Sequence, residues 1–315
     1  MRAREALETT NLTDGPQQNL LQFIFFNQRG LRPGWRLLIF VALFVGISQV
    51  VSILVRYVAG RRLQGLYPSA LIANETIVFL IVVLCTWIMS RIERRRMGEY
   101  GLPLRNSGAL PRFVRGHIFW GFLPLTLLLL VLRALRVFYF GSPVLHGGQI
   151  IFWAGVWGLL FILVGLAEEY TLRGYALYTL AEGIGFWPAA IVLAALFAVA
   201  HTFNAGESRI GIVMTALFAM FASMTLRYTG NLWLAVGAHA GWDWGESYFY
   251  GVNDSGIQLR GHLLEPHLQG PAWLNGGTVG PEGSIVCLVL VVGMSILFAL
   301  LYRKAREPVL VVTRQ

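Results

Sequence analysis

The sequence predicts an all-α protein, a polytopic transmembrane helix bundle of about eight spans with an intramembrane polar cavity. The composition is the first observation: of 315 residues, 56% are hydrophobic and 13% are charged, and the mean hydropathy is +0.61. A soluble domain carries about a quarter charged residues, so this composition argues against one large water-soluble globule. The second observation is that apolar runs of about twenty residues, the length that crosses about 30 Å of hydrocarbon, recur along the chain. The third is that a few ionisable residues fall within those runs, where only a protein interior would tolerate them.

The chain divides into an N-terminal segment, a membrane domain and a tail. Residues 1–34 are expected to form a cytoplasmic and interfacial segment, because residues 1–19 are polar and the apolar patch at 20–26 is too short to cross a bilayer. Residues 35–302 form the predicted transmembrane domain, and residues 303–315 form the C-terminal tail.

Apolar runs bounded by Arg, Gly or Pro mark the expected spans. They lie at about 35–57, 69–90, 114–132, 150–180, 186–203, 210–228, 231–250 and 284–302. The fourth run is longer than one crossing needs, and the fifth to seventh carry polar groups. The motif-bearing core is expected at about 150–250. The polar, Gly- and Pro-containing stretch at 251–283 is expected to be an extramembrane loop.

The basic residues indicate which side each segment faces. With a cytoplasmic N-terminus, 18 of the 25 basic residues fall on the cytoplasmic side, most densely in residues 91–115. Both termini are therefore predicted to be cytoplasmic. Lys304 is the only lysine, and this near-exclusive use of arginine favours a GC-rich prokaryotic source, and hence a multi-pass protein of a prokaryotic cell membrane.

Two functional classes find no support in the composition. The basic residues lie between apolar runs rather than on a folded polar domain, so a nucleic-acid partner is not expected. Cys85 and Cys287 both lie inside apolar runs without metal-type spacing, so neither a disulfide scaffold nor a cysteine zinc site is indicated.

Three clusters of polar or aromatic residues stand out inside the fourth, fifth and seventh spans. They are Glu168 and Glu169 with Arg173, Phe197 with His201, and His239 with Asp243. A carboxylate at the bilayer centre costs on the order of 2.5 to 3.5 kcal/mol, so such residues need a structural or functional reason. In each cluster the principal pair is spaced i, i+4, which places both side chains on one helix face.

A hairpin turn at about Gly183 would bring these clusters to similar depths. At 1.5 Å per residue, Glu168 stands roughly 22 Å and His201 roughly 27 Å from that turn. Continuing the count through the sixth and seventh spans places His239 and Asp243 within about 14 Å of the same level. The four groups are therefore expected to share one polar cavity.

Each cluster also has a simpler explanation. Glu169 and Arg173 could form a structural ion pair, which leaves Glu168 as the surplus carboxylate able to act as a base. His239 and Asp243 could form a local hydrogen bond that stabilises their helix. Glu75, near the start of the second span, and Glu246, expected at the outer interface, are weaker candidates for the site.

The three motifs in this order resemble those of the CPBP family of intramembrane proteases, which includes the CAAX prenyl endopeptidases and bacteriocin-immunity relatives. The motifs read Glu168-Glu169-Tyr170-Thr171-Leu172-Arg173, Phe197-Ala198-Val199-Ala200-His201 and His239-Ala240-Gly241-Trp242-Asp243. The resemblance covers residues 150–250. It implies a bundle of eight helices with a water-accessible cavity in which a peptide bond is hydrolysed.

By motif position, the resemblance also implies roles for individual residues. Glu168 would activate water, His201 would help to hold it, and His239 with Asp243 would stabilise the oxyanion or bind a metal. Asp243 stands where the eukaryotic CAAX enzymes have Asn, and an ionised aspartate cannot donate a hydrogen bond to an oxyanion. We therefore expect Asp243 to orient His239.

Metal use stays open at this point. Glu168, His201 and His239 are a plausible ligand set for zinc or another divalent metal, although the His-Glu-x-x-His spacing of zincins is absent. The same residues suffice for a glutamate-dependent mechanism without metal.

The expected function is that of a membrane-embedded endopeptidase. Its partners would be the lipid bilayer and a peptide or protein substrate near the membrane interface, lipidated in the best-known members of the family. Two alternatives from other classes remain. One is a proton- or ion-coupled transporter, since Glu, His and Asp also build proton relays. The other is a noncatalytic scaffold or immunity factor on the same fold.

Overall fold

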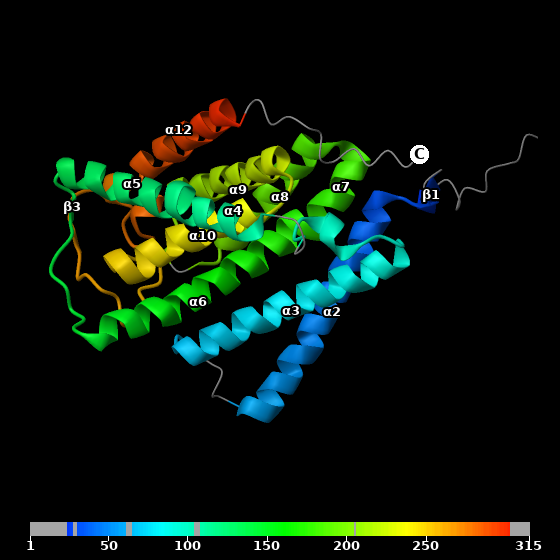
Figure 1. The fold of residues 1–315 in the computed structure, drawn as a ribbon, viewed down its shortest axis with the longest axis horizontal. Coiled ribbons are helices and arrows are strands. Elements are labelled where there is room, and N and C mark those ends of the chain that lie inside the picture. The colour runs from blue at the N-terminus through cyan, green and yellow to red at the C-terminus, as the bar shows by residue number, and fades with distance from the viewer. Residues whose placement is uncertain (1–23, 28–29, 61–64, 104–107, 205, 303–315) are drawn as a thin grey trace, which may run out of the picture.

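The computed structural model describes residues 24–27, 30–60, 65–103, 108–204 and 206–302, and this part of the chain is a bundle of helices (Figure 1). The predicted all-α membrane bundle is therefore confirmed. The helical segments of the first half are α2 (Pro33–Ala59), α3 (Pro68–Ile92), η2 (Met97–Tyr100), α4 (Ala109–Arg115), η3 (Gly116–Phe122), α5 (Leu123–Ala134) and α6 (Gly148–Thr171). Those of the second half are η4 (Leu172–Ala176), α7 (Leu177–Ile184), α8 (Phe186–His201), α9 (Arg209–Thr229), α10 (Trp233–Trp244), η5 (Gly245–Tyr250), α11 (Ala272–Asn275), η6 (Pro281–Gly283) and α12 (Ile285–Leu301).

Within the described residues, five helical segments are long and apolar enough to cross a membrane, by length and composition. They are Pro33–Val58, Pro68–Ile92, Ala109–Ala134, Gly148–Ile184 and Arg209–Thr229. Helices α8 and α12 are apolar but shorter. Helix α8 ends at His201, and α12 begins directly after Ser284. The Oγ atom of Ser284 accepts a hydrogen bond from the backbone N–H of Cys287 at 3.1 Å, which caps α12.

The fourth predicted span, which is longer than one crossing needs, contains a break. Helix α6 ends at Thr171, and the π-helical η4 contains Gly174 with a non-helical ψ of −126° before α7 begins. A Cβ atom at Gly174 would lie 2.7 Å from the Tyr170 ring, so only glycine fits this bend. The turn to α8 comes at Gly185, two residues after the position that the sequence indicated.

Ion pairs connect the ends of three helices at one end of the bundle. Arg36 of α2 contacts Glu93 at 2.5 Å and Glu182 of α7 at 2.6 Å, and Arg95 contacts Glu182 at 2.5 Å. At the opposite end, strand β3 (Phe138–Tyr139) pairs with β4 (His267–Leu268) of the 251–283 segment. The predicted extramembrane loop is thus folded against the bundle rather than free of it.

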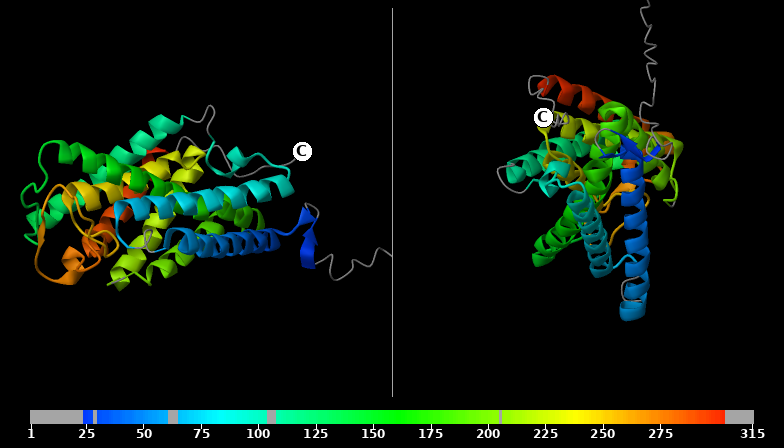
Figure 2. Two further views of the ribbon diagram at one scale, coloured as in Figure 1. Left: turned by 90° about the horizontal axis from the view of Figure 1, so that it is seen from below. Right: turned by 90° about the vertical axis from the view of Figure 1, so that its right-hand side faces the viewer.

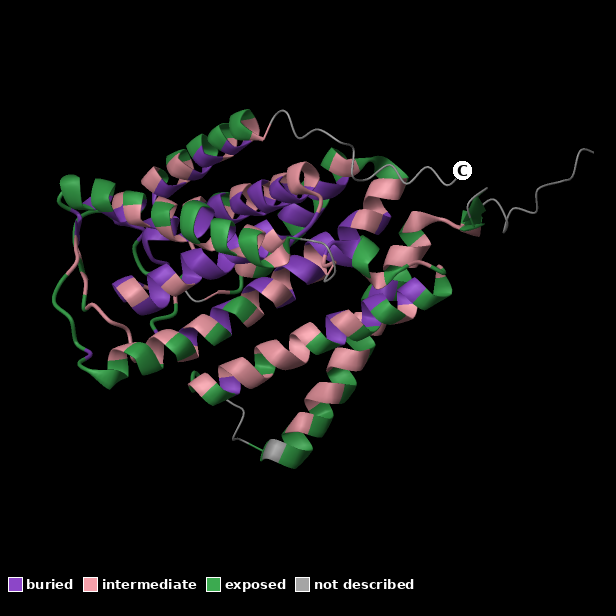
Figure 3. Ribbon diagram, in the orientation of Figure 1, coloured by how far each residue is buried: buried purple, intermediate pink, exposed green. Residues whose placement is uncertain are grey.

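Helix α10 lies at the centre of the bundle, and every residue from Leu234 to Asp243 is buried. Helix α2 lies at the periphery (Figure 2), and almost all of its residues are intermediate or exposed (Figure 3). Its exposed side chains include many large apolar ones, as suits contact with lipid. The motif residues on α10 are therefore held inside protein, whereas the outer helices face the hydrocarbon.

Glycines allow α10 to pack closely against α4 and η3. A Cβ atom at Gly237 would lie 2.1 Å from the Phe113 carbonyl oxygen, and one at Gly241 would lie 2.2 Å from that of His117. On the facing helix, added Cβ atoms at Gly116 and Gly121 would clash in the same way with the backbone of α10. Such small-residue contacts let membrane helices approach backbone to backbone. They fix the depth and rotation of α10, which carries His239 and Asp243.

Candidate functional site

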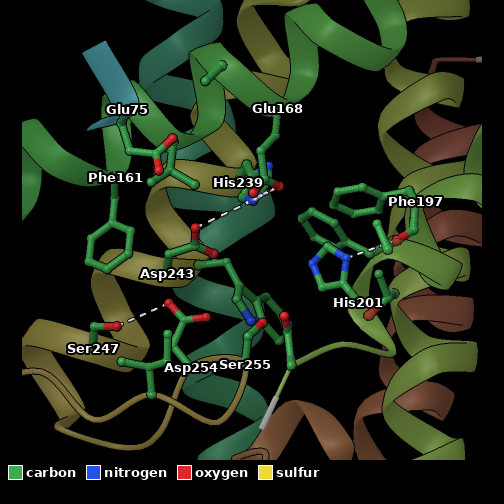
Figure 4. Close-up of a pocket in the computed structure, with 18 of the residues that line it drawn as sticks. Glu75, Phe161, Glu168, Phe197, His201, His239, Asp243, Ser247, Asp254 and Ser255 are labelled. Carbon is green, nitrogen blue, oxygen red and sulfur yellow. Dashed lines mark hydrogen bonds and ion pairs between the residues drawn. The ribbon is translucent and has the colours of Figure 1, made fainter. Parts of the chain in front are cut away.

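A cavity of about 570 Å³ lies among α3, α6, α8, α9, α10 and the loop that follows η5. Glu168, His201, His239 and Asp243 all line it (Figure 4). The structure thus places the four groups around one pocket, and their shared function stays a prediction. Glu169 and Arg173, by contrast, are not among its lining residues.

Glu169 and Arg173 form a buried ion pair on one face of α6 and η4. The Nη1 atom of Arg173 lies 3.2 Å from Oε1 of Glu169, and the two residues are 2% and 0% exposed. Their i, i+4 spacing stacks them on adjacent turns, as the sequence indicated. Glu168, the preceding residue, points instead toward the cavity, and about a third of its side chain is exposed.

His239 lies between Glu169 and the cavity. Its Nδ1 atom is 3.0 Å from Oε1 of Glu169, the same oxygen that Arg173 contacts. The carboxylate beside Arg173 can only accept, so His239 donates its Nδ1–H to Glu169. Its Nε2 atom consequently faces the cavity, and the ring orientation is set by Glu169.

Two carboxylates lie near the cavity-facing nitrogen of His239. Asp243 Oδ2 is 3.4 Å and Glu168 Oε2 is 3.6 Å from Nε2. Both distances are longer than an ordinary hydrogen bond. Asp243 therefore contacts His239, but the shorter bond that orients the ring comes from Glu169, whose spacing in the sequence indicates only the pairing with Arg173.

Phe197 connects the second motif to the first. Its backbone oxygen lies 2.9 Å from Nδ1 of His201, and the two rings pack edge to face with centroids 4.3 Å apart. A carbonyl only accepts, so Nδ1 of His201 carries the proton and Nε2 presents its lone pair. The guanidinium carbon of Arg173 lies 5.2 Å from the centre of the same Phe197 ring. The three motifs thus form one continuous network of contacts.

Three residues of the 251–283 loop that the sequence did not point to also line the cavity: Asp254, Ser255 and Glu282. Glu75 of α3, a weaker candidate from the sequence, lines it as well (Figure 4). The loop residues carry no periodic signal, and only the β3–β4 pairing and the close packing of the loop reveal their position. The expectation that Glu246 lies at the outer interface is wrong, because the residue is 0% exposed.

The expected metal ligands do not converge into a coordination shell. Within the described residues, the His, Cys, Asp or Glu group whose donor atoms all lie within 4.8 Å of one another comprises Glu246, Asp254 and Glu282. The set of Glu168, His201 and His239 is not such a group, and His201 lies across the cavity from His239 (Figure 4). In this arrangement those three residues do not fit a shared zinc ion.

Residues 149–245 match a protein-family model described as type II CAAX prenyl endopeptidase Rce1-like. The matched range contains all three motifs and ends one residue before Glu246. This match confirms the resemblance that the motifs indicated, at the level of a CAAX-type peptidase domain. No curated protein and no solved structure matches the chain.

Proposed function

We propose that this protein is an intramembrane endopeptidase of the CAAX type, and that Glu168 activates the water which hydrolyses the peptide bond. One observation carries the proposal: Glu168, His201 and His239 line a single cavity within an Rce1-like helical core. General acid–base catalysis needs such groups around one position that a water molecule and a carbonyl carbon can share.

The first step is the attack of water on the carbonyl carbon. The Glu168 carboxylate takes one proton from the water, and the Nε2 lone pair of His201 accepts a hydrogen bond from the other. The water oxygen then forms a bond to the carbon. Glu168 suits this role because, unlike Glu169, its carboxylate faces the cavity and forms no ion pair with an arginine among the described residues.

The second step is the collapse of the tetrahedral intermediate. His239, protonated at both nitrogens, donates its Nε2–H to the oxyanion, while Glu169 holds Nδ1 and Asp243 stabilises the imidazolium. The carbon–nitrogen bond breaks, and Glu168 returns its proton to the leaving amine. In this scheme Asp243 acts on His239 and needs no proton of its own, which is compatible with aspartate at a position where the eukaryotic CAAX enzymes carry asparagine.

The cavity walls favour a substrate with an apolar portion. Apolar side chains from α2, α3, α6 and α8 form much of the cavity wall, among them Phe44, Leu71, Phe161 and Leu196. A lipid-modified peptide could place its chain against this wall and its backbone beside Glu168. We therefore propose a lipidated peptide segment at the membrane interface as the substrate.

The proposal is tested by mapping peptides released from membranes that contain the wild-type protein or the Glu168→Ala variant. The expected result is a set of cleaved peptides that depends on Glu168. Purified protein should then cleave a synthetic peptide carrying a farnesylated cysteine faster than the same peptide with a free cysteine. Identical peptide maps from the two membranes would refute the peptidase, and equal rates on the two synthetic peptides would refute lipid recognition.

A further inference from the structure

A second group of carboxylates lies where the central helix meets the loop that follows it. Glu246 belongs to η5, Asp254 to the loop and Glu282 to η6, and one oxygen from each lies within 4.8 Å of the others. The group follows the matched family domain in the sequence. It shares no residue with the three motifs.

Glu246 has no hydrogen-bond partner for either carboxylate oxygen, although it is completely buried. The Trp242 indole lies in its neighbourhood but does not reach hydrogen-bonding geometry. A buried carboxylate without a partner costs several kcal/mol, so a folded protein retains one only when something else compensates it. Its carboxylate is directed at Asp254 and Glu282, which carry the same charge.

Local donors engage only part of the other two carboxylates. Ser247 donates its hydroxyl to Oδ2 of Asp254 at 3.1 Å. The backbone N–H and the hydroxyl of Ser255 both donate to Oε1 of Glu282, at 2.6 and 3.1 Å. In the described part of the chain, none of the ion pairs joins these three carboxylates to an arginine or histidine.

We propose that Glu246, Asp254 and Glu282 bind a hard divalent cation such as Ca²⁺. All three ligands supply oxygen, which hard cations prefer, whereas zinc favours nitrogen and sulfur. Two oxygens on opposite sides of a Ca²⁺ ion at about 2.4 Å stand about 4.8 Å apart, so the observed spread fits one ion. The cation would supply the positive charge that the buried carboxylates lack.

The ion would join the cavity loop to the helix that carries the catalytic candidates. Asp254 and Glu282 line the cavity, and η5 continues directly from α10, which holds His239 and Asp243. Water from the cavity can complete the coordination shell. The bound cation would therefore fix the loop wall of the cavity at a set position.

Binding can be measured on the full-length protein in detergent with Tb³⁺, which takes the place of Ca²⁺ and luminesces when nearby tryptophan is excited. Trp242, four residues before Glu246, would serve as the donor. We expect saturable Tb³⁺ luminescence that Ca²⁺ displaces, and a higher unfolding temperature with Ca²⁺ than with a chelator. Absence of both effects would overturn the proposal.

Substitutions of single carboxylates test which residues bind the ion. Glu246→Gln and Asp254→Asn should each weaken Ca²⁺ binding at least about tenfold, because each removes one charged ligand. Glu265→Gln, a largely exposed carboxylate on the same loop, and Glu168→Gln, in the main cavity, should bind Ca²⁺ as the wild type does. If Glu246→Gln does not fold, the Asp254→Asn variant still decides the question. Loss of binding in Glu168→Gln, with retention in Asp254→Asn, would place the ion elsewhere and refute the site.

The outcome is independent of the proposed peptidase. Luminescence and unfolding temperature need no substrate, so an inactive protein that binds Ca²⁺ would refute only the peptidase. An active protein that neither binds nor responds to Ca²⁺ would refute only the cation site.

Discussion

His239 Nδ1 lies 3.0 Å from Oε1 of Glu169, and Arg173 Nη1 lies 3.2 Å from that same oxygen. One buried carboxylate therefore anchors both an arginine and a histidine that come from different helices. The two adjacent glutamates thus have different surroundings. Glu169 holds the interior in place, and Glu168 faces the cavity.

The role of the Glu169 carboxylate in stability and in cleavage can be tested by removing its charge alone and together with that of Arg173. Glu169→Leu leaves Arg173 unpaired in the interior and should destabilise the protein by about 3–5 kcal/mol. Adding Arg173→Met removes the stranded charge and should restore most of the stability, since apolar replacement of a buried pair is often neutral. Cleavage should stay lost, because Nδ1 of His239 then lacks its acceptor. Wild-type cleavage by the double variant would show that the pair is only structural.

Phe197 should control the position of His201. Phe197→Leu removes both the ring contact with His201 and the cation–π contact with Arg173, and should cost about 2 kcal/mol of stability. We expect kcat to fall more than KM rises, because in the proposed mechanism His201 holds the attacking water rather than the peptide. Phe119→Leu, at an exposed phenylalanine, serves as the control for loss of a ring. Equal kinetics in the two variants would contradict the role of Phe197.

The loop carboxylates should make stability depend on pH when no divalent cation is present. Burial raises the pKa of Asp254 to about 6, and burial together with the neighbouring Asp254 raises the pKa of Glu282 to about 8. A carboxyl with a raised folded-state pKa contributes stability below its ordinary pKa and loses that contribution as pH rises through the folded value. In a chelator, the unfolding temperature should therefore fall between about pH 4 and pH 8. Asp254→Asn with Glu282→Gln should flatten this decline, and an unchanged slope would show that other groups cause it.

The predicted sidedness can be measured with single cysteines. Cys85 and Cys287 are buried, so a new exposed cysteine should label against a low background. Gln258→Cys, on the cavity loop, should react with an impermeant thiol reagent added outside intact cells. Glu99→Cys, at the opposite end, should react only after permeabilisation. The reverse pattern would place the cavity loop in the cytoplasm and both termini outside.

Most of the helical arrangement could be predicted from the sequence because a bilayer leaves few choices for a long apolar run. The ends of α2, α9 and α12 fall within about two residues of the expected limits. The break at Gly174 was less visible, since a glycine inside an apolar run does not reveal that a Tyr170 ring occupies its Cβ position.

The site was predictable only where its residues lie on regular helices. The i, i+4 spacing gave the Glu169–Arg173 and Phe197–His201 contacts directly. The bond between His239 and Glu169 joins residues 70 positions apart. It depends on the position of α10 in the bundle, which the close glycine contacts of that helix set. Asp254 and Glu282 come from an irregular segment without periodicity, so spacing could not place them beside the cavity.

The most direct test of the central claim is the cleavage rate of purified, membrane-reconstituted protein with Glu168→Gln, compared with Glu265→Gln. Glutamine keeps the size of the side chain but cannot take a proton from water, so turnover should fall by about 10²- to 10⁴-fold while the unfolding temperature stays unchanged. Glu265→Gln, whose side chain is 58% exposed and lies far from the motifs in sequence, should cleave at the wild-type rate. Cleavage by a folded Glu168→Gln variant at the wild-type rate would contradict the assignment of Glu168 as the base.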